Sequence, residues 1–351
     1  MVLPDGIERD VFVVDGTFSF EGADDAETVI SDAYLVPGLV DAHAHLQLWS
    51  PAGDDASLEE RVQASAQAQL DAGVLVLREP GGPEGSAPGV GPAHGLPRTA
   101  SAGRFLTPPG TYVPGYGRPT PEGELADAAE AEVRASGAWA KVIGDFPNPP
   151  EGRRQPHYSF QALAEAARRV HGAGGRIAIH ASHPDVIAAA IEARFDSIEH
   201  ATALRHEHVV ALEGSETVIV PTLMIEQPLA DLLRRIGVPQ SEFDAVMADF
   251  GRLPGVLRDA ADAGVTILAG TDAGMVPHGR IADEVRLLLK AGLPPADALG
   301  AASWKARSYL GHPGIEGGAP ADLVAYRSDP REDPEVLLDP AVIIFDGVRV
   351  R

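Results

Sequence analysis

The chain has 351 residues and a formal net charge of −23 at pH 7. Nucleic acid and anionic membrane surfaces would repel such a polyanion, so we expect neither as a partner. The sequence contains no cysteine, which excludes disulfides and thiolate ligands and leaves histidine, carboxylates and modified lysine to hold any metal.

The two ends of the chain carry short β-strand patterns. Residues 1–37 contain D-V-F-V-V-D and T-V-I-S, which are apolar or β-branched runs between Gly and Asp turns. Residues 313–351 contain D-L-V-A-Y and V-I-I-F-D-G-V-R-V, which return to the same pattern. We therefore expect the two ends to form one small composite β domain.

The middle of the chain, residues 38–312, alternates short apolar runs with longer Ala-rich amphipathic stretches. Residues 57–73 and 160–175 are the best predicted helices, because apolar residues recur at three-to-four spacing before a terminal Gly. Repeated strand-helix units predict an α/β fold of the (β/α)8 TIM-like barrel type. The eight predicted strands are 35–41, 73–78, 101–107, 138–143, 176–180, 195–200, 217–222 and 265–272.

Polar side chains stand at or near the ends of several of these runs. His43 and His45 follow the first run at positions i and i+2, which point the same way in an extended chain. His180 and His200 end two successive runs, and Asp272 ends the eighth. Such groups, if unpaired, would carry a large desolvation cost. A metal site at the barrel mouth removes that cost and explains the spacing.

Lys141 lies inside a run that we expect to be buried, A-W-A-K-V-I. An ammonium group there would repel a divalent cation, whereas a neutral lysine reacts with CO2 to give a carbamate, which is an oxygen ligand. Burial and nearby cations favour the neutral amine. A salt bridge from Lys141 to Asp145 or Glu79 is the alternative, and spacing alone does not decide between the two.

Five motifs in chain order resemble the metal-dependent amidohydrolase superfamily: V-P-G-L-V-D-A-H-A-H, W-A-K-V, I-A-I-H-A-S, D-S-I-E-H-A-T and L-A-G-T-D-A-G. The likeness is closest to its imidazolonepropionase-like and prolidase-like branch. The resemblance implies a distorted barrel with a β-sandwich built from both termini. It also implies two divalent ions, expected to be zinc: one held by His43, His45 and Asp272 and one by His180 and His200, with a CO2-derived carboxylate on Lys141 bridging them.

This resemblance implies hydrolysis of an amide-type C–N bond in a dipeptide-like, cyclic amide or N-acyl small molecule. A metal-bridging hydroxide would attack, and Asp272 would pass its proton to the leaving amine. Ester, lactone or phosphotriester hydrolysis at the same centre is the alternative, because such a hydroxide does not distinguish one acyl or phosphoryl group from another. A non-catalytic scaffold that has lost its metals is a third hypothesis.

The loops after the strands carry the residues that we expect to contact substrate. Tyr112, Tyr116 and Arg118 follow the third run and would clamp a carboxylate or carbonyl, or else pack the loop. Arg78 ends the second run and is also predicted to bind substrate. His278 follows the eighth run, where relatives often have a histidine, so we expect it to contact substrate or assist catalysis.

The sequence gives little on cellular context. No apolar run approaches the roughly 18 residues that span a bilayer, and the first residues lack the pattern of a signal peptide. We therefore expect a cytoplasmic protein that acts on a small molecule, and we leave a homo-oligomer open.

Overall fold

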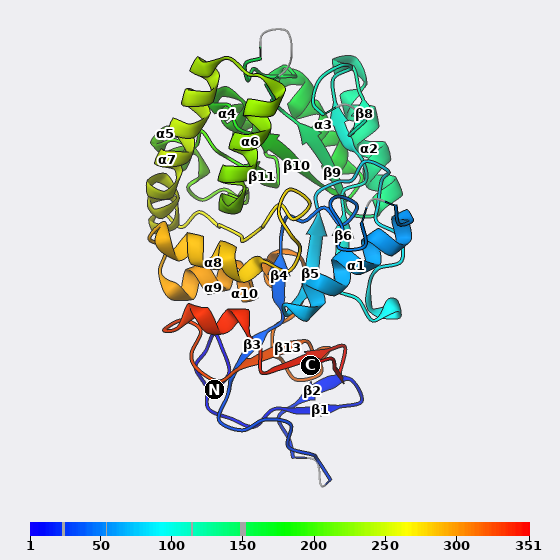
Figure 1. The fold of residues 1–351 in the computed structure, drawn as a ribbon, viewed down its shortest axis with the longest axis vertical. Helices are drawn as coiled ribbons and strands as arrows, with labels where there is room; N and C mark the ends of the chain where they lie inside the picture. Colours follow the sequence, from blue (N-terminus) through cyan, green and yellow to red (C-terminus); the bar gives the residue numbers. More distant parts are fainter. Residues whose placement is uncertain (23–24, 54, 114, 148–151) are drawn as a thin grey trace.

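Two parallel β-sheets lie at the centre of the computed structural model, which describes residues 1–22, 25–53, 55–113, 115–147 and 152–351 (Figure 1). One sheet has the order β12-β11-β10-β9-β7-β8 and the other β4-β5-β6. Their strands are β4 (Leu39–Asp41), β5 (Val74–Glu79), β6 (Arg98–Ser101), β7 (Phe105–Thr107), β8 (Arg118–Pro119), β9 (Trp139–Ile143), β10 (Arg176–Ala181), β11 (Ser197–His200) and β12 (Val218–Val220).

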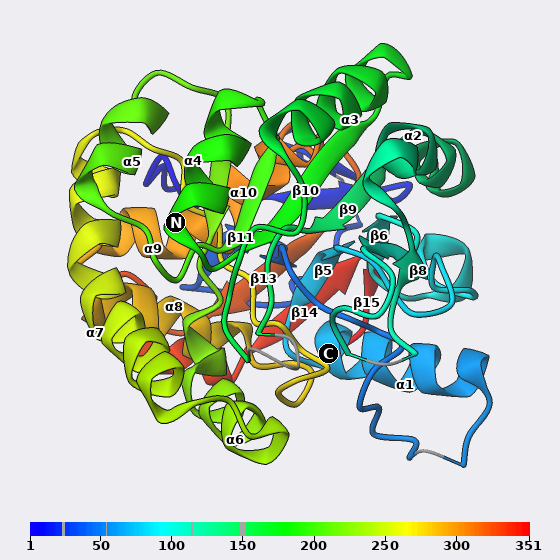
Figure 2. The same cartoon turned by 90° about the horizontal axis from the view of Figure 1, so that it is seen from above.

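Ten α-helices are found among the described residues, and they surround the sheets in the view from above (Figure 2). They are α1 (Leu58–Asp71), α2 (Leu125–Ser136), α3 (Phe160–Gly172), α4 (Pro184–Glu192), α5 (His206–Leu212), α6 (Glu226–Ile236), α7 (Gln240–Asp262), α8 (Ile281–Lys290), α9 (Pro295–Ala301) and α10 (Trp304–Tyr309). The helices expected over 57–73 and 160–175 are α1 and α3. Of the helices described, none is both long and apolar enough to cross a membrane.

Local sequence explains where helix α1 begins. Ser57 accepts a hydrogen bond on its hydroxyl from the backbone N–H of Glu60 at 3.3 Å, and the Glu60 carboxylate accepts one from the Ser57 N–H at 2.9 Å. This reciprocal pair satisfies two backbone donors that the first turn leaves without partners. The helix then buries Val62, Ala66 and Leu70 against the sheets.

Three of the eight predicted strands differ from expectation. The first run, 35–41, divides at Gly38 into β3 (Tyr34–Pro37) of the terminal sheet and β4 of a central sheet. The third run is broken at Gly103, whose φ of +70° turns the chain between β6 and β7. The eighth run, 265–272, is not a regular strand. Its backbone still bonds on both sides: the N–H of Leu268 donates to the carbonyl of Ile219, and Ala269 accepts from the N–H of Ala42, both at 2.9 Å.

The two ends of the chain share one antiparallel sheet at the lower end of Figure 1, because β3 pairs with β13 in the order β15-β14-β13-β3. Leu323 and Ala325 pack with Phe18 of a separate hairpin on one face, whereas Val324 and Tyr326 face the main core, as strand alternation requires. The domain boundaries at 37/38 and 312/313 stay a prediction. The elements here are β1 (Phe12–Val14), β2 (Thr17–Ser19), β3 (Tyr34–Pro37), β13 (Leu323–Tyr326), β14 (Val342–Phe345) and β15 (Val348–Arg349).

Candidate active site

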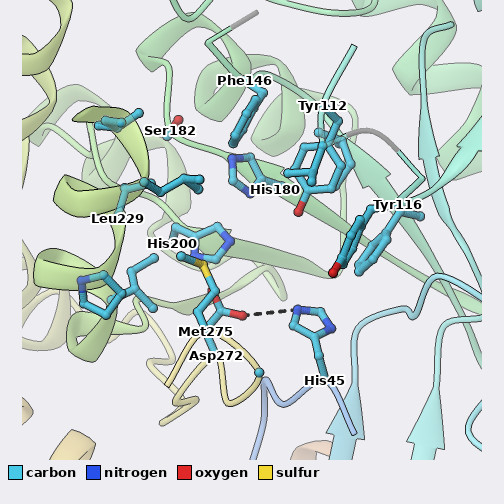
Figure 3. A pocket seen from close by; sticks show the side chains of 18 of the residues that line it. His45, Tyr112, Tyr116, Phe146, His180, Ser182, His200, Leu229, Asp272 and Met275 are labelled. Atoms are coloured by element: carbon cyan, nitrogen blue, oxygen red, sulfur yellow. Dashed lines mark ion pairs between the residues drawn. The ribbon is translucent and has the colours of Figure 1, made fainter. Parts of the chain in front are cut away.

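A cavity of about 530 Å³ lies at the carboxyl ends of the central parallel strands (Figure 3). Loops at this end of a parallel α/β fold are the usual place for an active site. All six residues predicted to hold metal line this cavity: His43, His45, Lys141, His180, His200 and Asp272. The sequence placed them on segments spread over most of the chain, and the fold brings them together.

Three of these residues converge most closely. The Nε2 atoms of His43 and His45 are 3.2 Å apart, and Asp272 Oδ1 lies 3.4 Å from the first and 3.2 Å from the second. One ligand atom from each of the three lies within 4.8 Å of the others. The strand itself ends at Asp41, so the two histidines follow it rather than belong to it.

The hydrogen bonds behind the two imidazoles fix which nitrogen faces the cavity. His43 Nδ1 lies 2.6 Å from Glu199 Oε2, and His45 Nδ1 lies 2.7 Å from the carbonyl oxygen of Gly81. Both partners can only accept, so each Nδ1 donates its proton and each Nε2 faces the point where the two rings meet Asp272. Two imidazole nitrogens and a carboxylate oxygen that converge on one point are a suitable ligand set for a divalent cation.

The second histidine pair is close to the first. The rings of His180 and His200 have centroids 4.5 Å apart, and the His43 and His200 centroids are 5.0 Å apart. His180 Nε2 is buried without a hydrogen-bond partner among the described residues, while His200 Nδ1 bonds Thr222 Oγ1 at 2.8 Å. Burial lowers the pKa of His180 to about 4, and burial with the neighbouring imidazoles lowers that of His200 well below its usual range. Both rings are therefore neutral, which is the form that binds metal.

Lys141 lies within β9 and is buried. Burial lowers the pKa of its amine to about 8, with Arg78 adding to this and Glu199 opposing it. The described residues form no ion pair between Lys141 and Asp145 or Glu79. Asp145 instead accepts hydrogen bonds from the backbone N–H groups of Ser182 and His183, and Glu79 accepts from Ser101 and Ala87. The salt-bridge alternative is thus not found.

Two of the clustered residues have unusual backbones. His200 has a φ of +67° and Asp272 a φ of +55°, a left-handed conformation that non-glycine residues rarely adopt. Such conformations cost free energy and persist where the surrounding structure enforces them, often at functional sites. No sequence pattern predicted these two turns.

Asp272 is held ionised. Burial by itself would raise the pKa of its carboxyl, but the charge of His43 and hydrogen bonds from His43 and His45 lower it well below its usual range. A carboxylate that stays ionised inside a cavity is suited both to bind a cation and to take up a proton.

Arg78 lies outside the cavity lining, and its role as a substrate-binding residue stays a prediction. Its guanidinium donates to Glu199 Oε2 and to the carbonyl of Ala42, both at 2.6 Å, and to Ser197 Oγ at 3.1 Å. The charge is therefore satisfied within the core. Arg78 holds Glu199, and Glu199 in turn orients His43.

Arg118 also lies outside the cavity lining, because the buried carboxylate of Glu132 on α2 accepts from it at 3.1 Å. The contact of Arg118 with a substrate carboxylate or carbonyl therefore stays a prediction. Tyr112 and Tyr116, from the same loop, do line the cavity, and Tyr112 packs between the rings of Phe105 and Phe146.

His278 is buried beside the cavity without lining it. Its Nε2 lies 3.3 Å from the carbonyl oxygen of Leu48, and its Nδ1 has no partner among the described residues. Burial lowers the pKa of its imidazole to about 4, so the ring is neutral. The predicted contact of His278 with substrate, or its part in catalysis, stays a prediction.

Sequence reasoning gave no role to two carboxylates that organise the site. Glu199 orients His43, and Asp41 accepts from the backbone N–H groups of His43 at 3.1 Å and Thr271 at 3.0 Å, which ties the first segment to the eighth. Each carboxylate stands within a predicted buried strand, Asp41 in L-V-D and Glu199 in S-I-E-H, and this position could have indicated a structural role.

The parallel α/β fold and a buried set of histidines, lysine and aspartate at its carboxyl end define a hydrolase of the amidohydrolase type. The model described as "Amidohydrolase family" matches residues 34–350, so the chain belongs to this family, as its motifs predicted. Uncharacterized proteins of Mycobacterium tuberculosis and Mycobacterium bovis are 36% identical over 348 residues, covering 98% of this chain and 93% of theirs.

Two solved structures show the same fold at lower identity. A Xaa-Pro dipeptidase with bound methionine superposes with a TM-score of 0.80 at 23% identity, covering 97% of this chain and 94% of that one. The ochratoxinase of A. niger gives a TM-score of 0.79 at 21% identity, covering 100% of this chain and 94% of that one. At these identities the likeness establishes the fold and not the substrate.

Proposed function

We propose that this protein hydrolyses an amide-type C–N bond of a small molecule at a centre of two divalent metal ions. The observation that carries the proposal is the convergence of His43, His45 and Asp272 on one point beside His180, His200 and Lys141. The solved structures named as a dipeptidase and an ochratoxinase support amide chemistry for this fold.

The side chains present fit the proposed ions. His180 Nε2 is a buried polar atom without a hydrogen-bond partner in the described part of the chain, and a lone pair of that kind is what a metal would satisfy. His43, His45 and Asp272 would hold one ion, and His180 with His200 a second, with zinc as the favoured ion for imidazole and carboxylate donors. Carboxylated Lys141 would link them, since its lowered pKa enlarges the neutral fraction that reacts with CO2.

Bound divalent ions would supply Lewis-acid activation of water and of the scissile carbonyl. Asp272 acts as general base and then as general acid: its carboxylate takes a proton from the attacking water and delivers it to the leaving nitrogen. Glu199 keeps the His43 ring in one tautomer. The rings of Tyr112 and Tyr116 border the cavity and contribute to substrate positioning.

We also propose that the scaffold is a distorted (β/α)8 barrel with a terminal β-sandwich. Support for the barrel comes from residues 265–273, which hydrogen-bond to both β12 and the segment around β4. Support for the sandwich comes from the small core between the β1-β2 hairpin and the shared terminal sheet, built around Phe18, Leu323 and Ala325.

The test uses the full chain reconstituted with Zn²⁺ and a set of N-acyl amino acids, Xaa-Pro dipeptides, lactams and neutral N-acyl amines. We expect zinc-dependent release of amine, which the variant Asp272→Asn abolishes and the control Asp297→Asn, on α9 outside the cavity lining, leaves intact. If the chain hydrolysed only esters, lactones or phosphotriesters, the proposed amide hydrolysis would be wrong and the alternative reaction would take its place. A folded chain that binds no stoichiometric metal would favour the scaffold and contradict the proposal.

A further inference from the structure

Helix α6 presents apolar side chains to the cavity that no apolar cluster of the described residues covers. Leu233 is buried and packs with Ile225, Val246 and Phe250 in a small core between α6 and α7. Pro228 and Leu232, by contrast, line the cavity, are only partly buried and belong to none of the apolar clusters of the described residues. When a ligand covers a half-buried apolar surface of this kind, the burial makes the free energy of binding more favourable.

The opposite wall of the cavity is aromatic. The ring centroids of Phe105 and Tyr112 are 5.9 Å apart and those of Tyr112 and Phe146 are 5.0 Å apart, all in edge-on contact. Figure 3 shows Leu229 and Tyr112 on opposite sides of His180, so an apolar wall stands on each side of the polar cluster.

Positive charge inside the cavity is already engaged. Arg154 donates to Glu242 at 2.8 Å, to Asp249 at 2.9 Å and to the carbonyl of Ser182 at 2.7 Å, so two carboxylates neutralise its guanidinium. Lys141 belongs to the proposed metal centre. The remaining basic side chain of the lining, apart from the histidines, is Arg235, which is exposed on the last turn of α6.

The residues outside the described ranges carry no lysine or arginine, so they add no further cation. Arg78 and Arg118, the two arginines predicted to bind substrate, are paired with Glu199 and Glu132 away from the lining. A carboxylate placed beside the scissile bond would thus be desolvated against apolar walls, with the solvent-exposed Arg235 as the one lining guanidinium of the described residues left to meet it, which is costly.

We infer that the site selects uncharged amides with an apolar group on each side of the scissile bond, over amides that carry a carboxylate next to it. The inference rests on the proposed amide hydrolysis and narrows its substrate class. The inference assigns Leu232 as a residue that determines specificity. Its side chain lines the cavity and belongs to no apolar cluster of the described residues, so a ligand is left to cover it.

A matched pair of substrates tests this: N-benzoylisobutylamine and N-benzoylvaline, which differ only by the carboxylate. With the zinc-loaded chain we expect kcat/KM to be at least about tenfold higher for the neutral amide, measured by benzoate release. Leu232→Gln should raise KM for the neutral amide several-fold. Ile236→Gln, an exposed position one turn further along the same helix and outside the lining, should leave it unchanged.

Binding is measured separately by titrating the neutral amide into the metal-free chain and its two variants in a calorimeter. Weaker binding by Leu232→Gln than by Ile236→Gln would support the proposed contact between the substrate and the apolar side chains of α6. If neither amide is cleaved, that support remains and only the proposed hydrolysis is contradicted. Equal behaviour of the two variants overturns the inference. Faster cleavage of N-benzoylvaline than of the neutral amide also overturns the inference. If Arg235→Gln then lost the preference for N-benzoylvaline, Arg235 would be identified as the residue that binds the carboxylate.

Discussion

Glu199 Oε2 lies 2.6 Å from Nδ1 of His43, although the two residues are separated by 156 positions in the chain. The same oxygen receives the Arg78 guanidinium at 2.6 Å. Burial by itself would raise the pKa of this carboxyl, but Arg78, Lys141 and His43 lower it well below its usual range. Glu199 therefore stays ionised, pairs with a buried arginine and orients an imidazole of the proposed metal centre.

The variant Glu199→Gln should weaken zinc binding by about 10–100-fold, because a partner behind a metal-ligating histidine contributes at that level. It should also lower the free energy of unfolding by about 3–5 kcal/mol, because Arg78 loses its buried counter-charge. Metal titration and chemical denaturation measure the two effects. The exposed Glu216→Gln is the control, and unchanged zinc affinity in Glu199→Gln would contradict the assigned role.

His180→Leu should separate metal binding from fold stability. The residues that the structure describes offer no partner to the buried Nε2 atom, so replacing the ring with an apolar side chain removes a desolvation cost. We expect the metal-free variant to melt at or above the temperature of the metal-free wild type. The rise in Tm on adding zinc should shrink, since fewer ligands remain in the folded state. His171→Leu, at an exposed helix end, should keep the full rise; a full zinc-induced rise in His180→Leu would argue against ligation by His180.

Lys141→Met should lose turnover and one of the proposed ions, because methionine cannot form the carbamate oxygens. Short carboxylic acids such as propionate should restore part of the activity by supplying a carboxylate in its place. Metal analysis and activity with and without propionate measure this, with the exposed Lys305→Met as the control. An active Lys141→Met with the wild-type metal content would refute a bridging lysine.

Glu284 should make the stability of the metal-free protein fall as the pH rises. Burial raises the pKa of its carboxyl from 4.5 to about 8, although the backbone N–H groups of Leu223 and Met224 donate to it and oppose the shift. The folded state thus keeps a proton that the unfolded state releases near pH 4.5. The stabilisation from this carboxyl is complete below that pH and is lost as the pH rises through about 8.

Denaturation curves between pH 5 and 9 measure this effect. Glu284→Gln should be less stable at low pH, because its amide N–H₂ replaces an oxygen that accepts from the backbone, and its stability should change less over this range. The exposed Glu192→Gln should keep the wild-type slope. Parallel curves for the wild type and Glu284→Gln would show that Glu284 does not titrate in this range.

Much of the fold followed from local patterns, and the failures have identifiable causes. The helices over 58–71 and 160–172 follow from apolar spacing and from Ser residues that cap them. The eighth strand failed as a regular strand, although its backbone hydrogen bonds to both neighbours are in place. Irregular pairing of that kind depends on the neighbouring strands, so the run of apolar residues could not reveal it.

The substrate contacts predicted for two arginines stay predictions, because the structure places both side chains outside the cavity lining. Arg78 and Arg118 stand next to strand ends, as expected, but each pairs with a carboxylate from a distant element, Glu199 and Glu132. Whether an arginine points to a cavity or to a carboxylate depends on which residues pack behind it. A single sequence does not contain that information.

The sequence by itself determined the chemistry of this protein: the kinds of donor side chain, their order along parallel strands and the family to which the chain belongs. Strand alternation and repeated strand-helix units are local rules, and they bring such residues to one edge. Only the tertiary structure decided the separation of 3.2 Å between two imidazole nitrogens, the carboxylates behind them and the apolar walls beside them. Those features arise from packing between segments that are remote in the chain. Burial and charge pairing there decide which side chain each histidine, arginine or carboxylate contacts.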